Sequence, residues 1–210
     1  LDSKIIELLF SRGLTTEEQI ITFLNPSKND FHDPFLLSGM KEAVEKVKES
    51  IDKKEKILIF GDYDVDGVSA TAIMIKTFAK VGYHVDFYLP NRFTDDYGLT
   101  KEVIDKIKDA YSPDLIITVD CGICCAKEIE YANTLGIEVI VTDHHEIPEV
   151  LPKKIVVNVK LEDQKYPFKD LCGTGVALKF AQAFLGFEKA EEFLPIAAIA
   201  TIADIVSLTD

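Results

Sequence analysis

The sequence predicts an α/β fold in which a largely parallel sheet is flanked by helices, with a helical lead-in at the amino end. Two observations carry this prediction. From Lys56 onward, short apolar runs alternate with longer amphipathic stretches, which is the pattern of a parallel sheet covered by helices. Before that point, apolar residues recur at helical spacing.

The predicted strands are the short apolar runs. They are "KILIF" (56–60), "HVDFYL" (84–89), "DLIITV" (114–119), "IEVIVT" (137–142) and "KIVVN" (154–158). Helices are predicted between them over residues 66–81, 100–110 and 124–135. After Leu171 the chain reads as helical again, through "GVALKFAQAFLG" and "AEEFLPIAAIATIA".

Residues 1–52 form the expected lead-in. The segment "TTEEQIITFL" carries a helix-capping signature, and "SGMKEAVEKVKESI" places apolar residues at helical spacing. We expect residues 53–210 to form one larger domain. Because the chain starts at Leu1 rather than Met and stops at "SLTD", we expect it to be a piece of a longer protein.

Composition and charge narrow the functional classes. The hydrophobic content of 47% suits a globular protein, and no apolar run approaches the ~18 residues of a membrane span. The amino end lacks the features of a signal peptide. A net charge of −13 argues against binding nucleic acid through basic charge alone, although it does not exclude a nucleic-acid enzyme.

Three of the four cysteines are crowded into "CGICC" at 121–125, and the fourth is Cys172. This spacing suits zinc better than a disulfide. We favour a packing role, because Cys121 follows a predicted strand and Cys124 and Cys125 open the next helix. Reduced cysteines in this number fit a cytoplasmic protein without membrane partners.

The stretch "GDYDVDG" places Asp62, Asp64 and Asp66 on alternate residues, followed by Gly67. An EF-hand loop begins in this way, but the continuation excludes one. The twelfth position of such a loop needs a glutamate and holds Ile73, and a strand rather than a helix precedes Asp62.

Further acidic and imidazole side chains lie just past the ends of other predicted strands. Asp120 follows "DLIITV", and "DHH" at 143–145 follows "IEVIVT". The carboxyl ends of parallel strands lie side by side and form the usual ligand crevice, so these residues are expected to meet. A lone Asp after a strand is usually a helix cap. Crowded carboxylates repel one another without cations, so the convergence predicts a metal cluster.

The motifs "GDYDVDG", "VDCGI", "VTDHH", "LCGTGVALK" and "IADIV" resemble, in order and spacing, those of the DHH phosphoesterase superfamily. They are most similar to its RecJ branch, the single-strand-specific DNA exonucleases. The resemblance covers nearly the whole chain, including "PNRFTDDYGL" and the lead-in. Two positions bear on it. Phe60 stands where small-nucleotide phosphodiesterases and pyrophosphatases carry a histidine, and Val159 in "VNVK" stands where RecJ proteins usually carry proline.

The resemblance implies a two-metal phosphodiesterase that digests single-stranded DNA from 5′ to 3′ in DNA repair and recombination. The donors, oxygen-rich with one or two imidazoles, suit Mn²⁺, with Mg²⁺ as the alternative. By resemblance, one metal is held by Asp62 and Asp64, the other by Asp66, His144 and Asp204, and Asp120 bridges them.

Four further predictions concern the surroundings of the metals. Asp143 is expected to orient His144 or the loop, as ligating histidines commonly require. His145 is the candidate to contact the scissile phosphate or to protonate the leaving oxygen. The turn "CGTG" offers backbone N–H groups of Gly173, Thr174 and Gly175 to a substrate phosphate, with a plain helix cap at Thr174 as an equal alternative. Arg92 is a weaker candidate for a phosphate contact.

Two other functions stay open. A small-nucleotide or nanoRNA phosphodiesterase would share the metals, but Phe60 speaks against it. A non-catalytic replication scaffold of the same superfamily is disfavoured because all expected ligands are present. The resemblance also implies a DHHA1-type domain and an oligonucleotide-binding domain in the full-length protein.

Overall fold

The structure, a computed structural model, describes residues 1–91 and 98–208. By its contacts the chain divides into two compact units, Leu1–Asp33 and Pro34–Asp210. The smaller unit contains α1 (Ser3–Ser11), α2 (Glu17–Leu24) and the 3₁₀ turn η1 (Lys28–Asp30). Helix α2 begins with a capping box between Thr16 and Gln19, as the sequence predicts.

Within the described residues, the larger unit contains five strands and the remaining helices. Its strands are β1 (Ile57–Gly61), β2 (Asp86–Tyr88), β3 (Leu115–Val119), β4 (Glu138–Asp143) and β5 (Ile155–Asn158). Its helices are η2 (Pro34–Leu36), α3 (Met40–Asp52), α4 (Val65–Lys80), α5 (Lys101–Tyr111), α6 (Ala126–Thr134), α7 (Gly173–Leu185), α8 (Phe187–Ala190), η3 (Glu191–Phe193) and α9 (Leu194–Ala203). The five predicted strands and the helices between them are confirmed.

The strands form one parallel sheet in the order β2-β1-β3-β4-β5. β2 lies on one side of β1, and β3 lies on the other side. The helix after β1 and the helix after β3 therefore cover opposite faces, which opens a crevice at the carboxyl ends of these two strands. This order explains why the predicted acidic residues come together.

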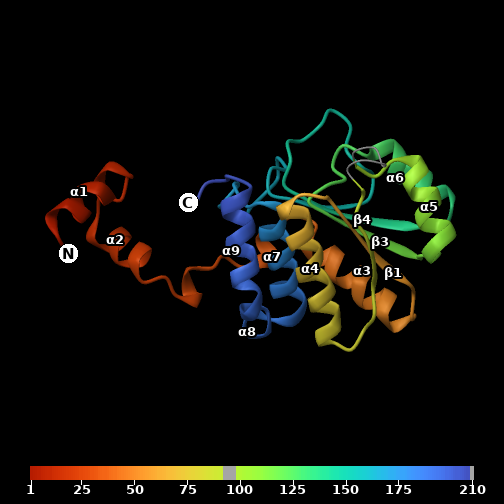
Figure 1. Ribbon diagram of the computed structural model, residues 1–210, viewed down its shortest axis with the longest axis horizontal. Coiled ribbons are helices and arrows are strands. Elements are labelled where there is room, and N and C mark those ends of the chain that lie inside the picture. The colour runs from red at the N-terminus through yellow and green to blue at the C-terminus, as the bar shows by residue number, and fades with distance from the viewer. Residues whose placement is uncertain (92–97, 209–210) are drawn as a thin grey trace. The chain divides into compact units, whose positions relative to one another are not determined.

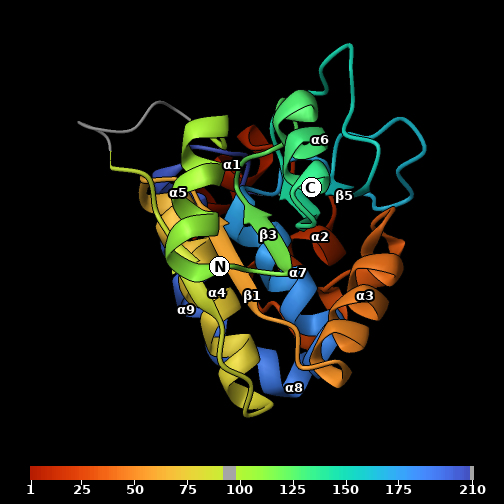
Figure 2. The ribbon, with the colours of Figure 1, turned by 90° about the vertical axis from the view of Figure 1, so that its right-hand side faces the viewer.

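Helices cover both faces of the sheet, so the strands are apolar on both sides (Figure 1 and Figure 2). Alternate residues of β1, β3, β4 and β5 enter two separate cores. Ile57, Ile59 and Ile117 pack toward α3, α4 and α7, whereas Leu58 and Phe60 pack toward α5 and α6. All of these side chains are buried, and their burial supplies the main driving force for this fold.

The boundary of the larger unit differs from the expected one near residue 52. Helix α3, which the sequence analysis assigns to the lead-in, contacts α7 and β5. Its residues Met40, Ala43, Val44 and Val47 are buried in the same core as Ile57 and Ile59. The apolar spacing of this segment was recognised, but the sequence does not show which surface its apolar face covers. Helix α3 is thus a structural part of the sheet-containing unit.

Among the described residues, none of the helices combines the length and the apolar character that crossing a membrane requires.

The boundary can be tested by truncation. We expect a chain of residues 34–210 to fold cooperatively, because it keeps both cores. A chain of residues 53–210 should fail to fold cooperatively, since it lacks four buried α3 residues that pack on the sheet. Thermal unfolding followed by circular dichroism compares the two. A cooperative transition in the chain of residues 53–210 would show that α3 is dispensable.

Candidate metal centre

The residues predicted to bind metal meet at the carboxyl ends of β1, β3 and β4. Asp62 directly follows β1, Asp120 directly follows β3, and Asp143 is the last residue of β4, one position earlier than expected for a residue after the strand. Asp204 comes from the far end of the chain, where it caps α9. The fold therefore brings Asp62 and Asp204, which are 142 positions apart in the sequence, into one crevice.

The turn after β1 and the first turn of α4 carry three aspartates in different surroundings. The Asp62 side chain accepts a hydrogen bond from the Tyr63 N–H (2.6 Å), and Asp64 caps α4 by accepting one from the Gly67 N–H (2.9 Å). Asp66 lies within the first turn of α4 and is buried. A Cβ at Gly67 would lie 2.5 Å from the carbonyl oxygen of Asp62, so only glycine lets the helix start this close to the strand.

Asp120 lies at the centre of the cluster and is held in a strained conformation. Its backbone φ is +60°, which is unfavourable for a residue with a side chain and is typical of functional sites. The side chain is buried. In the absence of cations, burial and then the charges of Asp66 and Asp64 raise the pKa of Asp120 to about 10. The carboxylate form of Asp120 therefore requires a compensating positive charge.

His144 lies among three carboxylates. Its Nε2 atom is 3.1 Å from Asp120 Oδ1, 3.7 Å from Asp66 Oδ2 and 3.8 Å from Asp204 Oδ2. Burial, followed by the neighbouring His145, lowers the pKa of His144 and so favours the neutral imidazole, which is the form that binds metals. Burial raises the pKa of Asp204, with Asp66 adding to this effect and His144 opposing it.

The potential ligand atoms form sets with metal-binding spacing. In each set, the donor atoms lie within 4.8 Å of one another. The sets are Asp62, Asp64 and Asp120; Asp66, His144 and Asp204; and Asp120, His144 and His145. The first two sets contain the residues that the sequence analysis assigned to separate metals. Asp120 belongs to the first set and also lies against His144 of the second, which is the position expected of a bridging ligand.

Two buried carboxylate oxygens without a hydrogen-bond partner within the described part of the chain indicate that the cluster suits cations. Asp120 Oδ1 and Asp204 Oδ2 are buried and accept no hydrogen bond from the described residues; His144 Nε2 is near Asp120 Oδ1 but is poorly aligned for one. Buried carboxylate oxygens are almost always paired or bound to metal. The donor set of hard oxygens and imidazole is also that of Mn²⁺ and Mg²⁺ sites. The cluster therefore fits a pair of divalent cations.

Asp143 contacts the ring of His145 and the main-chain N–H of His144. Its Oδ1 atom accepts hydrogen bonds from the N–H groups of His144 (2.7 Å) and His145 (3.1 Å), and it lies 2.8 Å from His145 Nδ1. Its Oδ2 atom accepts one from the Ile123 N–H (2.9 Å). Burial favours the acid form, but the hydrogen bond and charge of His145 outweigh it and lower the pKa of Asp143. The same hydrogen bond raises the pKa of His145, whose side chain is 45% exposed at the crevice.

The first turn of α7, which begins at Gly173, has a different set of contacts from the one expected. The N–H groups of Gly173 and Thr174 donate to the two oxygens of Asp66, at 2.6 and 2.8 Å, and the Thr174 hydroxyl donates to the Asp66 carbonyl. The Gly175 N–H is directed to Cys172 Sγ. These donors hold Asp66 in place, and the helix N-terminus stabilises its charge. The N–H groups of Gly173 and Thr174, which were expected to bind a substrate phosphate, thus bind the Asp66 carboxylate instead.

Two other predicted features need separate mention. Arg92 lies outside the described residues. Cys121 is buried beside Asp120 with its thiol directed at the Val119 carbonyl (3.4 Å), while Cys124 is exposed and Cys125 caps α6. The cysteine side chains thus lie around the loop that supports Asp120.

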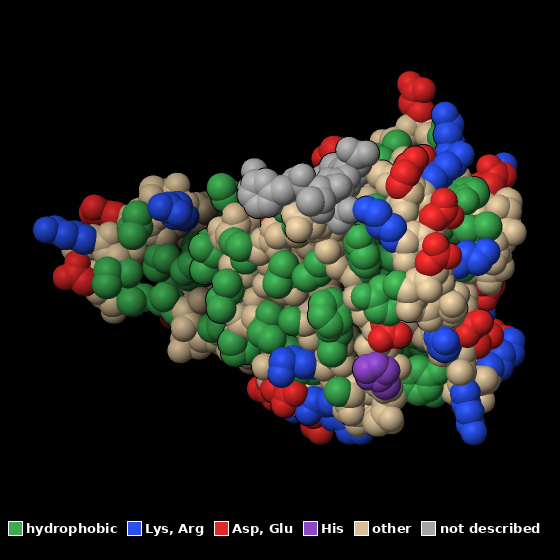
Figure 3. Space-filling model, turned by 45° about the vertical axis from the view of Figure 1, so that its right-hand side comes forward, with side chains coloured by type: hydrophobic (Ala, Val, Ile, Leu, Met, Phe, Trp, Pro, Cys, Tyr) green, Lys and Arg blue, Asp and Glu red, His purple; other side chains and the backbone are tan. Residues whose placement is uncertain are grey.

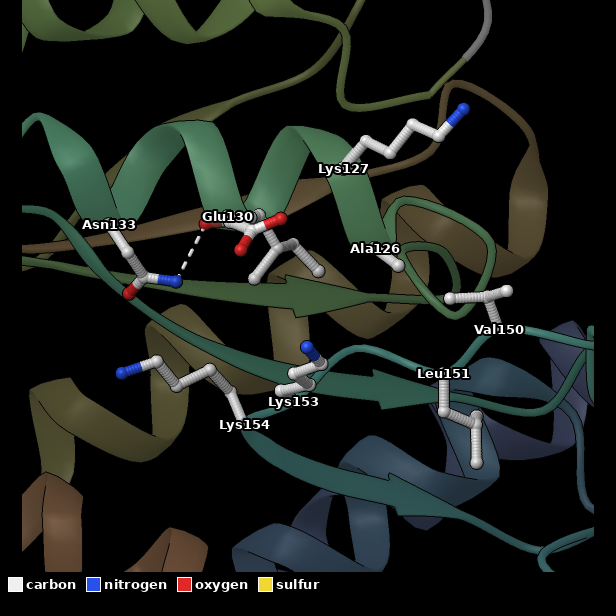
Figure 4. A pocket seen from close by; sticks show the side chains of 9 residues that line it. Ala126, Lys127, Glu130, Asn133, Val150, Leu151, Lys153 and Lys154 are labelled. Atoms are coloured by element: carbon white, nitrogen blue, oxygen red, sulfur yellow. Dashed lines mark hydrogen bonds between the residues drawn. The ribbon is translucent and has the colours of Figure 1, made fainter.

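A separate cavity of about 310 Å³ lies between α6 and the segment before β5 (Figure 4). None of its nine lining residues belongs to the predicted site. Its lysines do not converge on one point, because Lys127 points away from Lys153 and Lys154, and Glu130 offsets part of their charge. The metal centre is therefore the site with the clearest chemical signature.

The sequence analysis missed the roles of Gly67 and Gly173. A Cβ at Gly173 would lie 2.4 Å from Asp120 Oδ1, so glycine is required where α7 meets the cluster. Both glycines were visible within motifs, but their neighbours are set by tertiary contacts. Asn158, at the end of β5, was also missed; a polar residue ending a buried strand was the available signal.

Residues 56–207 match the family described as "DHH family, N-terminal domain". The single-stranded-DNA-specific exonuclease RecJ of Bacillus subtilis is 47% identical over 98% of this chain, and the RecJ protein of Escherichia coli is 37% identical over 82%. The chain spans only 26% of the length of the first of these relatives and 32% of the second.

Solved structures of RecJ proteins also match this chain. A crystal structure of exonuclease RecJ bound to manganese matches with a TM-score of 0.73 and 35% identity, covering 81% of this chain and 44% of that one. RecJ from Thermus thermophilus in complex with Mn²⁺ matches with a TM-score of 0.69 and 33% identity, covering 82% and 25%. The α/β fold with a parallel sheet is thus shared with these proteins.

Removing the charge of Asp120 should stabilise the metal-free chain. The folded pKa of Asp120, about 10, exceeds its ordinary value of 3.8, so between these values the fold holds a proton that the unfolded chain releases. Its contribution to stability therefore falls as pH rises. We expect Asp120→Asn to raise the melting temperature without metal by about 2–4 °C per kcal/mol gained, and more at pH 8 than at pH 5.

The same variant should lose most of the stabilisation that Mn²⁺ gives to the wild type. Asp109→Asn, on the exposed surface of α5, is the matched control and should leave both measurements unchanged. A wild-type response of Asp120→Asn to both pH and Mn²⁺ would contradict the central position of this carboxylate.

Gly173→Ala should displace Asp120. Its added Cβ would also lie 2.5 Å from the Cβ of Asp120, too close for two carbon atoms. We expect a loss of about 1–3 kcal/mol in stability, as overpacking usually gives, together with weaker Mn²⁺ binding in calorimetry. Gly175→Ala is the control on the same helix, because the atoms nearest to its Cβ belong to the Leu171 side chain, at 3.2 Å or more, and not to Asp120. Equal Mn²⁺ affinities for the two variants would disprove the crowding argument.

Proposed function

Because the chain belongs to the DHH family, we propose that it is the catalytic part of a two-metal phosphodiesterase that digests single-stranded DNA from 5′ to 3′. The observation that carries the proposal is the convergence of two three-ligand sets at one crevice, with Asp120 close to both. Two bound divalent cations supply an activated water and neutralise charge on a phosphodiester undergoing displacement. The RecJ relatives and their Mn²⁺ complexes support this choice of reaction and metal.

Each ligand residue has a defined task in this proposal. Asp62 and Asp64 would hold one cation, Asp66, His144 and Asp204 would hold the other, and Asp120 would serve both. Mn²⁺ is the preferred ion, with Mg²⁺ as the alternative. The α7 N-terminus fixes Asp66 from behind, so its carboxylate keeps one orientation before a cation binds.

His145 is proposed to act on the substrate. Asp143 holds its Nδ1 and raises its pKa, which favours the protonated ring. A protonated His145 can donate from Nε2 to an oxygen of the scissile phosphate or to the leaving oxygen. The ring stands 4.5 Å from that of His144, measured between centroids, so it reaches the same crevice without sharing the role of His144.

Phe60 provides a structural argument against a small-nucleotide phosphodiesterase. The histidine of such proteins would stand at this position, but Phe60 is fully buried and stacks on Tyr88 with ring centroids 6.0 Å apart. It belongs to the core toward α5 and α6 and provides no ligand. The non-catalytic scaffold is disfavoured because the two ligand sets converge with metal-binding spacing.

Charge distribution bears on substrate affinity. On the face shown in Figure 3, Lys and Arg side chains are interspersed with Asp and Glu side chains. Together with the net charge of −13, this leads us to propose that the cations capture one phosphate while other parts of the full-length protein hold the strand. DHHA1-type and oligonucleotide-binding domains are the proposed partners, and a cytoplasmic location stays a prediction from the cysteine content.

The test is digestion of an end-labelled single-stranded oligonucleotide with Mn²⁺. We expect products released from the 5′ end, slowly and with a shallow dependence on salt. Asp120→Ala should abolish hydrolysis, and His145→Ala should reduce it by about 10²- to 10⁴-fold, the usual contribution of general acid catalysis. Duplex DNA and a short dinucleotide serve as comparison substrates. Preferential cleavage of the dinucleotide would favour the small-nucleotide alternative, and activity in Asp120→Ala would disprove the two-metal assignment.

A further inference from the structure

Asn158 is a buried polar residue at the end of β5, next to the loop that carries His145. It is fully buried, and it pairs in the sheet register with Asp143 at the end of β4. Burying polar side chains such as these is unfavourable unless they form hydrogen bonds. Asp143 and Asn158 are the last residues of β4 and β5, the strands before and after the loop that carries His145.

Three polar atoms of Asn158 have hydrogen-bond partners, two in its side chain and one in its main chain. Nδ2 donates to the carbonyl oxygen of His145 (3.0 Å), and Oδ1 accepts from the Lys160 N–H (2.8 Å). Its own carbonyl accepts from Gln164 Nε2 (2.8 Å). His145 is therefore fixed at three polar atoms: its N–H and Nδ1 contact Asp143, and its carbonyl contacts Asn158.

Two further contacts extend this support. Lys160, whose N–H is held by Asn158, places its ammonium 2.8 Å from Glu146, the residue after His145. Gln164 accepts from the N–H groups of Ser38 (3.0 Å) and Tyr166 (3.2 Å) through Oε1. The histidine loop is thus tied through Asn158 and Gln164 to the segment just before α3, which packs in the core.

We propose that Asn158 is a positioning residue for His145. Asp143 sets the direction of the ring through Nδ1, while Asn158 sets the position of the backbone from which the ring projects. With both in place, His145 Nε2 stays directed at the crevice. This inference rests on the proposed role of His145 at the scissile phosphate. Misplacing such a group by about 1 Å is enough to slow catalysis by about 10²-fold.

The most informative variant is Asn158→Asp. It keeps the size and the acceptor for Lys160, but it replaces the donor to the His145 carbonyl with an oxygen that repels it. Asn133→Asp is the matched control, because Asn133 Nδ2 also donates to a main-chain carbonyl, that of Ile129 (2.7 Å), at the separate cavity on α6 (Figure 4). Both variants are made in the 210-residue chain.

Three measurements are needed. Hydrolysis of bis-p-nitrophenyl phosphate with Mn²⁺ gives kcat and KM without a contribution from strand binding. Calorimetry gives the Mn²⁺ affinity. Imidazole ¹H–¹⁵N spectra at one fixed pH report the environment of His145, which is identifiable because the chain has only four histidines and His145→Gln removes its signals.

For Asn158→Asp we expect kcat to fall by about 10- to 100-fold while KM and Mn²⁺ affinity change less than about threefold. The His145 signals should shift, and Asn133→Asp should match the wild type in all three measurements. Wild-type kcat and unshifted His145 signals in Asn158→Asp would overturn the inference. A loss of Mn²⁺ affinity in proportion to kcat would also overturn it, because the effect would then act through the metals.

A second variant covers the case in which Asn158→Asp does not fold. Gln164→Ala removes the next link and should shift the His145 signals and lower kcat in the same direction; no change in either would overturn the inference. If the wild type hydrolyses no phosphodiester, the proposed function fails, and the imidazole spectra of the variants alone decide whether Asn158 positions His145.

Discussion

Electrostatic repulsion among carboxylates at the ends of three parallel strands is the constraint around which this structure is organised. Strand order places β1 beside β3, and the residues that follow these strands are aspartates rather than small neutral groups. Such an arrangement is unfavourable in a metal-free protein, where burial and then the charges of Asp66 and Asp64 raise the pKa of Asp120. The fold tolerates it because two extensive apolar cores hold the sheet in place.

Main-chain groups do much of the work of holding the acidic residues. The amide groups at the starts of α4 and α7 hold Asp64 and Asp66, and the loop after β3 donates to Asp143. Main-chain donors are less mobile than long basic side chains, and they add no positive charge that would compete with a cation. Orientation and charge compensation are therefore separated: the backbone supplies the first, and the metals supply the second.

The sequence predicts the strands and the metal ligands because both leave local signals. Apolar runs such as "DLIITV" mark buried strands, and acidic residues just after three of these runs mark the edge of the sheet. Asp204 follows no predicted strand and was assigned from the family resemblance alone. Contacts between distant segments leave no such signal. Gly173 and Asp66 are 107 residues apart, and Asn158 reaches His145 across a loop, so their roles depend on how the strands and helices pack. The apolar face of α3 was recognisable for the same local reason, but its partner was not.

The packing of α3 against α7 also orders events during synthesis of the chain. These two helices lie more than 120 residues apart, yet they share one core with β1 and β3. On the ribosome α3 and α4 can cover only part of that face of the sheet until α7 has emerged, and Asp204 emerges later still. Contacts of such long range slow folding and prolong the exposure of apolar surface. The nascent protein is thus unable to bring Asp204 to Asp66 and His144 before almost all of these 210 residues have been made.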